Sequence, residues 1–392
     1  MKTFKPIAAI ALTLIFAASV KAASPFDGSG SFEEPGLMEV PAVTEASAVN
    51  APGLTEAEVP AHGYTPGQLS EMRRHNSSVD VSANKGVSFA DERVEIKYRP
   101  YADYEKTGYL IMSSAFNFDS RQAKLLMASK LPADGTLVIF TDTYGTSKEE
   151  ILRAYESVIP RKRIKVITLP NASRGFWARD GIPVPAMDAS NKLVVVDAAY
   201  GHRFEPDAEI ARLFGARVEK HDYYFEGGNF MANHTGTCIM VNAHAHVRIP
   251  DSVFAGQYGC REMIRLPLVD GIGHIDEHVR FISEKVVVTD LPQYKETLEG
   301  KGLTVHMLPK PTGPYETYVN SLLMDGKIVV PVFGRDTDEQ ALAVYRSLGL
   351  EAFGANSRSL SNQGQGSVHC ITMTYPKVPA RELMKALGAT EL

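Results

Sequence analysis

The sequence predicts an α/β protein, and two observations carry this prediction. From Tyr109 onward, short apolar runs of strand length alternate with helical segments, which is the pattern of α/β folds. Clusters of polar residues and glycine directly follow several of the apolar runs, and such folds gather their functional sites at strand ends and in the turns after them. The chain has 392 residues, 44% hydrophobic and 22% charged, as in an ordinary globular protein. Because the connections are short and evenly spaced, we expect one domain over residues 91–392.

The apolar pattern predicts the individual elements. Strands are expected at 109–112, 136–140, 164–169, 193–198, 237–242, 279–282, 286–289, 303–308 and 328–333. Helices are expected at 120–131, 147–158, 206–214, 291–300 and 338–348. Ser147 and Glu150 have the Ser-x-x-Glu spacing of a capping box, which places a helix start at Ser147. No internal repeat is visible from residue identity.

The N-terminal residues have the pattern of a secretory signal peptide. Lys2 and Lys5 precede an apolar core at 7–18, and Val20-Lys21-Ala22 has the small-x-small pattern of a cleavage site after about Ala22. The apolar core is too short to span a membrane. We therefore predict an exported protein, periplasmic or secreted, from which residues 1–22 are removed.

Residues 23–90 lack a periodic apolar pattern and are rich in Ala, Glu, Pro, Ser and Gly. Such a composition buries too little apolar surface to offset chain entropy. We predict a flexible leader or pro-segment here.

Charge and motif spacing exclude several classes of partner. The net charge of -5 offers no basic surface for nucleic acid, and the later apolar runs are too short for a membrane span. His244 and His246 are close in sequence, but no CxxC or HExxH spacing is present. We expect no metal and no other cofactor, and we interpret these two histidines as structural.

The three cysteines point to one free thiol. In an oxidising compartment an odd cysteine is either paired between molecules or free and reactive, and Cys238 and Cys260 could pair with each other. Cys370 then remains, at the end of the small-residue run 364–367 and in a strand-like apolar segment. A buried structural cysteine is the alternative interpretation.

Three upstream clusters carry charged groups. In Gly273-His274-Ile275-Asp276, an extended backbone would place the imidazole and the carboxylate on one face, as a general acid/base beside an anionic anchor. Trp177-Ala178-Arg179-Asp180 and Glu226-Gly227-Gly228-Asn229 are expected to be turns that each present a carboxylate. The alternatives are a surface loop, a structural salt bridge and a hairpin with an exposed glutamate, respectively.

Together these groups suggest chemistry on a guanidinium. Two carboxylates, Asp180 and Asp276, repel each other when no cation is bound, and a planar guanidinium with five donors would bridge them. Its carbon is a poor electrophile, so it needs a soft nucleophile, for which Cys370 serves, and a proton donor for the departing nitrogen, for which His274 serves. Glu226 would fix the tautomer of His274. A thiol protease would need only one carboxylate near the histidine.

These motifs, in this order, resemble the guanidino-group-modifying enzymes, and within them the branch that joins agmatine deiminases with bacterial, Porphyromonas-type peptidylarginine deiminases. The likeness covers about residues 103–375. The matching stretches are W-x-R-D, E-G-G-N, G-H-x-D, 314–322, 329–331 and 369–372. The resemblance implies a five-bladed α/β propeller, the pentein fold, with the active site in its central channel.

The resemblance also implies a role for each residue. Asp180 and Asp276 would bind the guanidinium, and His274 would act as general acid/base with support from Glu226. Cys370 would form a covalent amidino-thioether, after which ammonia leaves and water releases the ureido product. Further substrate-binding residues are expected at Trp177, Arg179, Asn229 and Arg203.

Features of both branches are present. The segment 104–109, the stretch 318–322 and the predicted export resemble the peptidylarginine branch, whereas the glutamate of E-G-G-N is that of agmatine and free-arginine deiminases. The peptidylarginine enzyme holds a substrate carboxylate with two arginines, and here only Arg203 is available. We predict deimination of peptidyl or free arginine to citrulline and ammonia. The alternatives are agmatine deimination to N-carbamoylputrescine, amidino transfer to an amine, and a non-catalytic module that binds cationic peptides.

Overall fold

The computed structural model describes residues 59–80 and 94–379, and these residues form five separate sheets. The first contains β17 (Met373–Pro376), β2 (Thr107–Ser113), β3 (Thr136–Thr141) and β4 (Ile164–Thr168), and the second contains β1 (Tyr98–Pro100), β5 (Val184–Asp188), β6 (Leu193–Ala199) and β7 (Arg217–Tyr224). The third contains β10 (Glu262–Pro267), β9 (Thr237–Asn242) and β8 (Met231–Ala232), and the fourth β11 (Val279–Phe281), β12 (Val286–Thr289) and β13 (Thr304–Met307). The fifth contains β14 (Leu322–Met324), β15 (Lys327–Val332) and β16 (Glu351–Asn356).

Short helices lie between the strands. They are α1 (Pro66–Ser78), α2 (Arg121–Lys130), α3 (Lys148–Tyr155), α4 (Ala178–Gly181), α5 (Asp207–Phe214), α6 (Asp251–Val253), α7 (Pro292–Gly300), α8 (Asp338–Ser347) and α9 (Arg358–Asn362). Short 3-10 and π segments are η3 (Arg161–Arg163), η4 (Ala172–Arg174), η5 (Gly227–Asn229), η6 (His246–Arg248), η7 (Phe254–Tyr258) and η8 (Ile275–Glu277). No helix of the described residues is long and apolar enough to cross a membrane.

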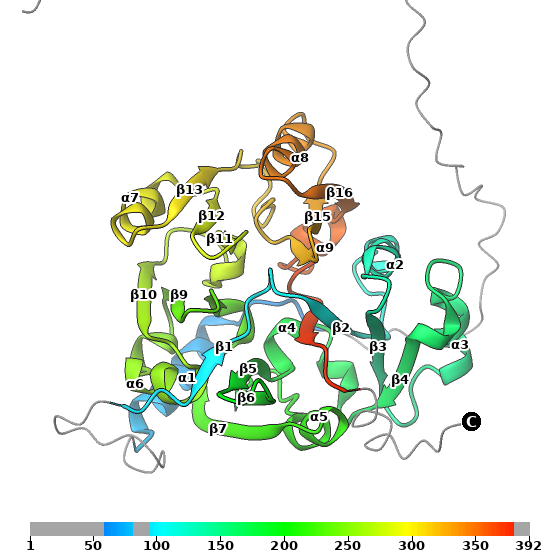
Figure 1. Ribbon diagram of the computed structural model, residues 1–392, viewed down its shortest axis with the longest axis horizontal. Coiled ribbons are helices and arrows are strands. Elements are labelled where there is room, and N and C mark those ends of the chain that lie inside the picture. The colour runs from blue at the N-terminus through cyan, green and yellow to red at the C-terminus, as the bar shows by residue number, and fades with distance from the viewer. Residues whose placement is uncertain (1–58, 81–93, 380–392) are drawn as a thin grey trace, which may run out of the picture. The chain divides into compact units, whose positions relative to one another are not determined.

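All five sheets are built from one unit. In each, a central strand pairs antiparallel with one neighbour and parallel with the other. A parallel pair requires a crossover connection, which α2, α5, α6 with η7, α7 and α8 supply in turn. In Figure 1 the sheets follow one another around a common centre, and β17 pairs with β2, so the last strand completes the first sheet. The predicted five blades agree with this arrangement. The five sheets share one topology, although the sequence shows no repeat at the level of residue identity.

Buried apolar side chains pack the helices against the sheets. Tyr345 and Ala341 of α8, for example, pack against Ile328 and Val330 of β15. Ser147 caps α3 and forms the predicted capping box. Cys238 and Cys260 are joined by a disulfide, which links β9 to the segment before β10. Cys370 is free.

Part of the predicted leader is folded, which differs from the expectation of a flexible segment over 23–90. Residues 66–78 form α1, which begins with a capping box between Thr65 and Gln68. The Asn76 side chain donates hydrogen bonds to the carbonyls of Tyr224 and Ala245 and accepts one from the Tyr224 N–H. These contacts attach α1 to the protein through a polar residue, a signal that a search for apolar periodicity cannot detect. The predicted signal peptide and residues 23–58 and 81–90 of the predicted leader lie outside the described residues.

Candidate active site

The site is assembled from the connections between sheets. Going along the chain, the connection from each sheet to the next supplies at least one site residue, and the fifth connection returns to the first sheet. One residue from each connection, in chain order, gives Asp180, Glu226, His274, Asn320 and Cys370, and Asp276 lies in the same connection as His274. Because the sheets surround a common centre (Figure 1), segments far apart in sequence meet there.

Cys370 lies in a turn rather than in the predicted strand. Residues 368–371 form this turn, and β17 begins only at Met373. The buried sulfur accepts a hydrogen bond from Asn320 Nδ2 at 3.1 Å, and Asp276 Oδ2 lies 3.6 Å from it. The glycines before it are required by close packing, since a Cβ on Gly366 would lie 2.5 Å from the ring of Trp177. The small-residue run therefore presents the thiol between an amide and a carboxylate.

Asp276 is held with one oxygen free of hydrogen bonds. It belongs to the 3-10 segment η8, so the predicted extended arrangement of His274 and Asp276 is wrong. Asp276 Oδ2 lies 2.7 Å from Nδ1 of His369, whose Nε2 lies 2.8 Å from Asp103. Asp276 Oδ1 is buried and has no hydrogen-bond partner among the described residues. Its lone pairs are available to a cationic ligand beside Cys370.

Asp180 and His274 meet around Gly228. The Gly228 N–H donates a hydrogen bond of 2.9 Å to Asp180 Oδ1, and His274 Nδ1 lies 3.7 Å from the same oxygen. A Cβ on Gly228 would stand 2.7 Å from His274 Nδ1 and 2.8 Å from Asp180 Oδ1. Only glycine allows the three groups to approach this closely.

Glu226 contacts a different histidine more closely than the predicted one. Its Oε2 lies 4.0 Å from His274 Nε2 but 2.5 Å from Nε2 of His246. Asn229 lies beside this pair: its side chain contacts His246 Nδ1 at 2.6 Å and accepts from the Ile275 N–H at 3.1 Å. His246 thus belongs to the outer layer of the site. Asn229 is buried and positions η8, and its amide is engaged by His246, the main chain of Val241 and the Ile275 N–H.

The two arginines expected to bind substrate, Arg179 and Arg203, have different surroundings. The Arg179 guanidinium contacts Asp103 at 3.4 Å and donates to the Thr372 carbonyl at 3.1 Å. It therefore ties α4 to the segment that carries Cys370. Arg203 is exposed, with a φ of 60°, and within the described residues it forms no ion pair.

A residue of the leader occupies the centre of the site. The His62 imidazole forms a buried hydrogen-bonded ion pair with Asp180 Oδ2. Its ring is stacked on Trp177 with centroids 4.4 Å apart and an interplanar angle of 15°, and its centroid lies 5.0 Å from that of His274. Sequence reasoning missed this residue because the surrounding composition suggested only flexible chain. Asn320 and His369 were missed as individual residues, although both lie in stretches that carry the family resemblance.

The electrostatics of the site favour a bound cation. Burial opposes ionisation, but His62, His274 and the Gly228 N–H together hold the pKa of Asp180 at about 2. Burial, Asp276 and Asp180 raise the pKa of the Cys370 thiol well above its usual range. Burial lowers the pKa of His274, which favours the neutral imidazole. The thiol is therefore protonated until a cation offsets the charge of the carboxylates.

One group of described residues could hold a metal ion. Ligand atoms of His62, Asp180 and His274 all lie within 4.8 Å of one another. The ion pair between His62 and Asp180 explains the closeness of these groups without a metal ion. Burial lowers the pKa of His62, but the charge of Asp180 and its hydrogen bond raise it by more, so the pKa of His62 is raised overall and the charged imidazolium is favoured.

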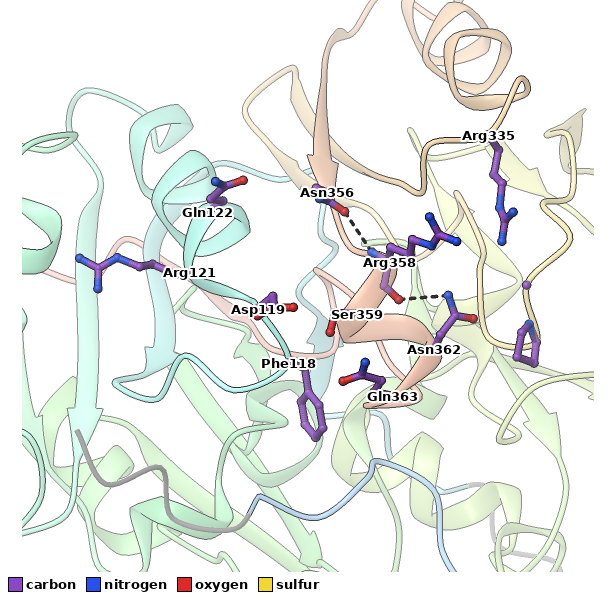
Figure 2. A pocket seen from close by; sticks show the side chains of 12 residues that line it. Phe118, Asp119, Arg121, Gln122, Arg335, Asn356, Arg358, Ser359, Asn362 and Gln363 are labelled. Atoms are coloured by element: carbon purple, nitrogen blue, oxygen red, sulfur yellow. Dashed lines mark hydrogen bonds between the residues drawn. The ribbon is translucent and has the colours of Figure 1, made fainter. Parts of the chain in front are cut away.

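A pocket in the described part of the chain has a lining that does not include Cys370. It has a volume of about 890 Å³. In Figure 2, Arg121 lies on one side of Asp119 and Phe118, and two further arginines of the wall, Arg358 and Arg335, lie on the other. The Phe118 ring is stacked on Trp177 with centroids 5.9 Å apart.

Comparisons with known proteins give likenesses in sequence and in fold. A family model described as Porphyromonas-type peptidyl-arginine deiminase matches residues 136–376, which include the site residues contributed by the sheet connections. An inferred agmatine deiminase of Shewanella baltica (strain OS195) is 23% identical over 281 residues, which cover 52% of this chain and 74% of the relative.

Solved structures show the fold. A substrate-bound variant of the agmatine deiminase of C. jejuni superposes with a TM-score of 0.59 at 17% identity, covering 71% of this chain and 96% of the other. The agmatine deiminase of Enterococcus faecalis superposes with a TM-score of 0.58 at 16% identity, and the superposition covers 74% of this chain and 100% of the other. With the five sheets, these likenesses show that the predicted pentein fold is correct.

Proposed function

Because the chain belongs to the Porphyromonas-type peptidyl-arginine deiminase family, we propose that it converts peptidyl or free arginine to citrulline through a covalent intermediate on Cys370. The coarser activity is that of the family and its relatives: a hydrolase that deiminates guanidino groups, acting on a C–N bond of an amidine. The observation that supports the proposal most directly is the unpartnered, buried Oδ1 of Asp276, because the other oxygen of the same carboxylate, Oδ2, lies 3.6 Å from the Cys370 sulfur.

Binding prepares the nucleophile in this account. A guanidinium between Asp180 and Asp276 offsets the two negative charges that raise the pKa of the Cys370 thiol. The thiol then loses its proton to the neutral His274 imidazole, and the Asn320 amide stabilises the thiolate through its hydrogen bond at 3.1 Å. The substrate thus generates the thiolate that attacks it.

The chemistry proceeds in two balanced steps. The sulfur bonds to the guanidinium carbon, and the C–N bond to a terminal nitrogen breaks as His274 returns the proton, so that ammonia leaves. Water then adds to the amidino-thioether carbon, His274 accepts its proton, and the C–S bond breaks. The products are a ureido group and the regenerated thiolate, so no oxidant and no cofactor is consumed.

The substrate is tested by a direct comparison. Protein comprising residues 23–392 would be incubated with agmatine, free arginine, a peptide with an internal arginine and a peptide with a C-terminal arginine, and ammonia and ureido product would be measured. Turnover of peptides supports the proposal. Turnover of agmatine alone, which the named activity of the relatives favours, would assign the chain to that substrate instead. Transfer of the amidino group to an added amine would indicate a transferase, and ligand binding without turnover a binding module.

We further propose that the protein is exported, on the pattern of residues 1–22. Expression of the full chain in a Gram-negative host should give a mature N-terminus near Ala23 in the periplasmic or medium fraction. Full-length protein confined to the cytoplasm would contradict export.

A further inference from the structure

Residues 60–64 lie along the site and contact it mainly through their main chain. The Pro60 carbonyl accepts a hydrogen bond from Trp177 Nε1 at 3.1 Å. On the other side of the inserted ring, the Gly63 N–H donates to Gln365 Oε1 at 3.2 Å. This segment therefore enters the site, inserts one side chain and continues beyond it.

The inserted residue is held at both of its main-chain polar groups. The His62 N–H donates to the Gly364 carbonyl at 2.8 Å, and the His62 carbonyl lies 3.2 Å from Nε2 of His202. The pocket wall is shaped for the ring, because a Cβ on Gly366 would lie 2.8 Å from His62 Nδ1. These contacts to the main chain of the segment do not depend on which side chain it carries. Another polypeptide could therefore make the same contacts, as in other modes of peptide recognition.

The inserted ring also contacts the groups assigned to the guanidinium. His62 is a flat, buried side chain that stacks on Trp177 and pairs with Asp180. It leaves Asp276 Oδ1 without a partner. An arginine has three methylenes before its guanidinium, so from the same main-chain position it would extend deeper, toward Asp276 and Cys370.

We infer that residues 60–63 are a tethered pseudosubstrate: their main chain occupies the subsite that binds the backbone of an internal arginine in a polypeptide substrate, and His62 takes the place of that arginine. This inference rests on the proposed deiminase function and specifies its substrate class. Agmatine has no peptide main chain, and free arginine has none on both sides of its side chain. Gly364, Trp177, His202 and Gln365 thereby become specificity-determining residues.

The same contacts make the segment an intramolecular competitor. Helix α1 follows directly and is anchored through Asn76 to the carbonyls of Tyr224 and Ala245. A tethered occupant acts at a high effective concentration, and a substrate then binds only the fraction of molecules in which the segment has left. The Tyr64 hydroxyl also anchors the segment, because it donates a hydrogen bond of 3.1 Å to Glu226 Oε1.

The first test removes the inserted side chain. His62→Ala should increase kcat/KM for a peptide with an internal arginine by about tenfold or more, mainly through KM, because the competing segment is weakened. His306→Ala, at a partly buried histidine of β13, is the matched control and should leave kcat/KM unchanged. Unchanged or lower kcat/KM in His62→Ala would overturn the inference, since His62 would then be inert or part of the catalytic machinery.

The second test turns the segment into a substrate. In His62→Arg, the enzyme should deiminate its own residue 62, which mass spectrometry of the peptide around it detects as replacement of an NH group by oxygen. The rate should not depend on protein concentration, because the reaction is intramolecular. The double variant His62→Arg/Cys370→Ser is the control and should show no conversion. Absence of citrulline at position 62, in protein that deiminates added peptides, would overturn the inference.

A binding measurement separates failure of this inference from failure of the proposed function. Cys370→Ser and Cys370→Ser/His62→Ala would be titrated with a fluorescent peptide that has an internal arginine. Binding that is about tenfold tighter in the double variant would support occupancy of the subsite by His62. This result would stand even if no variant turned over any guanidinium compound. Such a lack of turnover would defeat the proposed function but not this inference. Equal binding by the two variants would overturn the inference.

Discussion

The side-chain amide of Asn320 holds Cys370 through both of its ends. Its Nδ2 donates to the Cys370 sulfur at 3.1 Å, and its Oδ1 accepts from the Cys370 N–H at 3.4 Å. The amide thus fixes the sulfur, and in the proposed mechanism it also supplies a donor for the negative charge of the thiolate. Hydrogen bonds to charged groups are stronger than those between neutral groups, so this contact strengthens as the thiolate forms.

Asn320→Ala should therefore reduce thiol reactivity. Loss of a hydrogen bond to a charged group costs about 1.5–3 kcal/mol, which corresponds to a decrease in kcat/KM of roughly tenfold to a hundredfold. The rate of Cys370 alkylation at fixed pH should fall with it. Asn356→Ala, at an exposed position of β16, is the control. An Asn320→Ala protein with unchanged alkylation and turnover would contradict this role.

The pH dependence of alkylation tests the effect of the carboxylates on the thiol. Burial, Asp276 and Asp180 raise the pKa of Cys370, and the thiolate is the reactive form, so alkylation by neutral iodoacetamide should keep rising with pH beyond the range of an ordinary thiol. Asp276→Asn removes one negative charge and should shift the profile to lower pH. Both profiles are best recorded with His62→Ala present, so that the site is open. A shift to higher pH would contradict the account.

The variant Gly228→Ala tests how closely the side chains of Asp180 and His274 must approach one another. Gly228→Ala places a Cβ 2.7 Å from His274 Nδ1 and 2.8 Å from Asp180 Oδ1, so the two side chains must separate. Turnover should fall by about a hundredfold, as a displacement of that kind does in other enzymes. Gly300→Ala is the matched control, because nothing lies within 4 Å of a Cβ there. Equal kcat/KM for the two variants would show that the approach is unimportant.

The disulfide between Cys238 and Cys260 should contribute to stability without contributing to the chemistry. It closes a loop with a sequence separation of 22, for which loop-closure entropy predicts about 3 kcal/mol. The double variant Cys238→Ala/Cys260→Ala should lose about this much free energy of unfolding, measured with urea. Reductant should destabilise the native protein and leave the variant unaffected. A reductant effect of equal size on both proteins would point to another cause.

The motifs could be found in the sequence because the fold uses one connection from each sheet. Asp180, Glu226, His274 and Cys370 occur in chain order at the connections between sheets, and each stands next to residues that permit a turn or close packing. The strands β9 and β12 have the predicted bounds, since both are short, buried and apolar. Several edge strands were missed, such as β7, because their polar residues alternate with few apolar ones.

Other parts of the site depend on tertiary contacts that no local pattern specifies. Gly228 brings Asp180 and His274 together, and His246 comes closer to Glu226 than His274 does. Backbone periodicity also failed at η8, where the extended interpretation of the segment placed Asp276 wrongly. The insertion of His62 into the site was beyond prediction, because the leader's composition carries no apolar signal for it.

Trapping a covalent intermediate would decide whether Cys370 is the nucleophile. His62→Ala protein would be mixed with a peptide containing an internal arginine, quenched in acid during steady-state turnover, and digested for mass spectrometry. We predict an amidino-thioether on the peptide that contains Cys370, present during turnover and absent once the substrate is exhausted or when Cys370 is replaced by serine. Continued release of ammonia with no adduct on Cys370, and at the same rate in Cys370→Ser, would contradict the account.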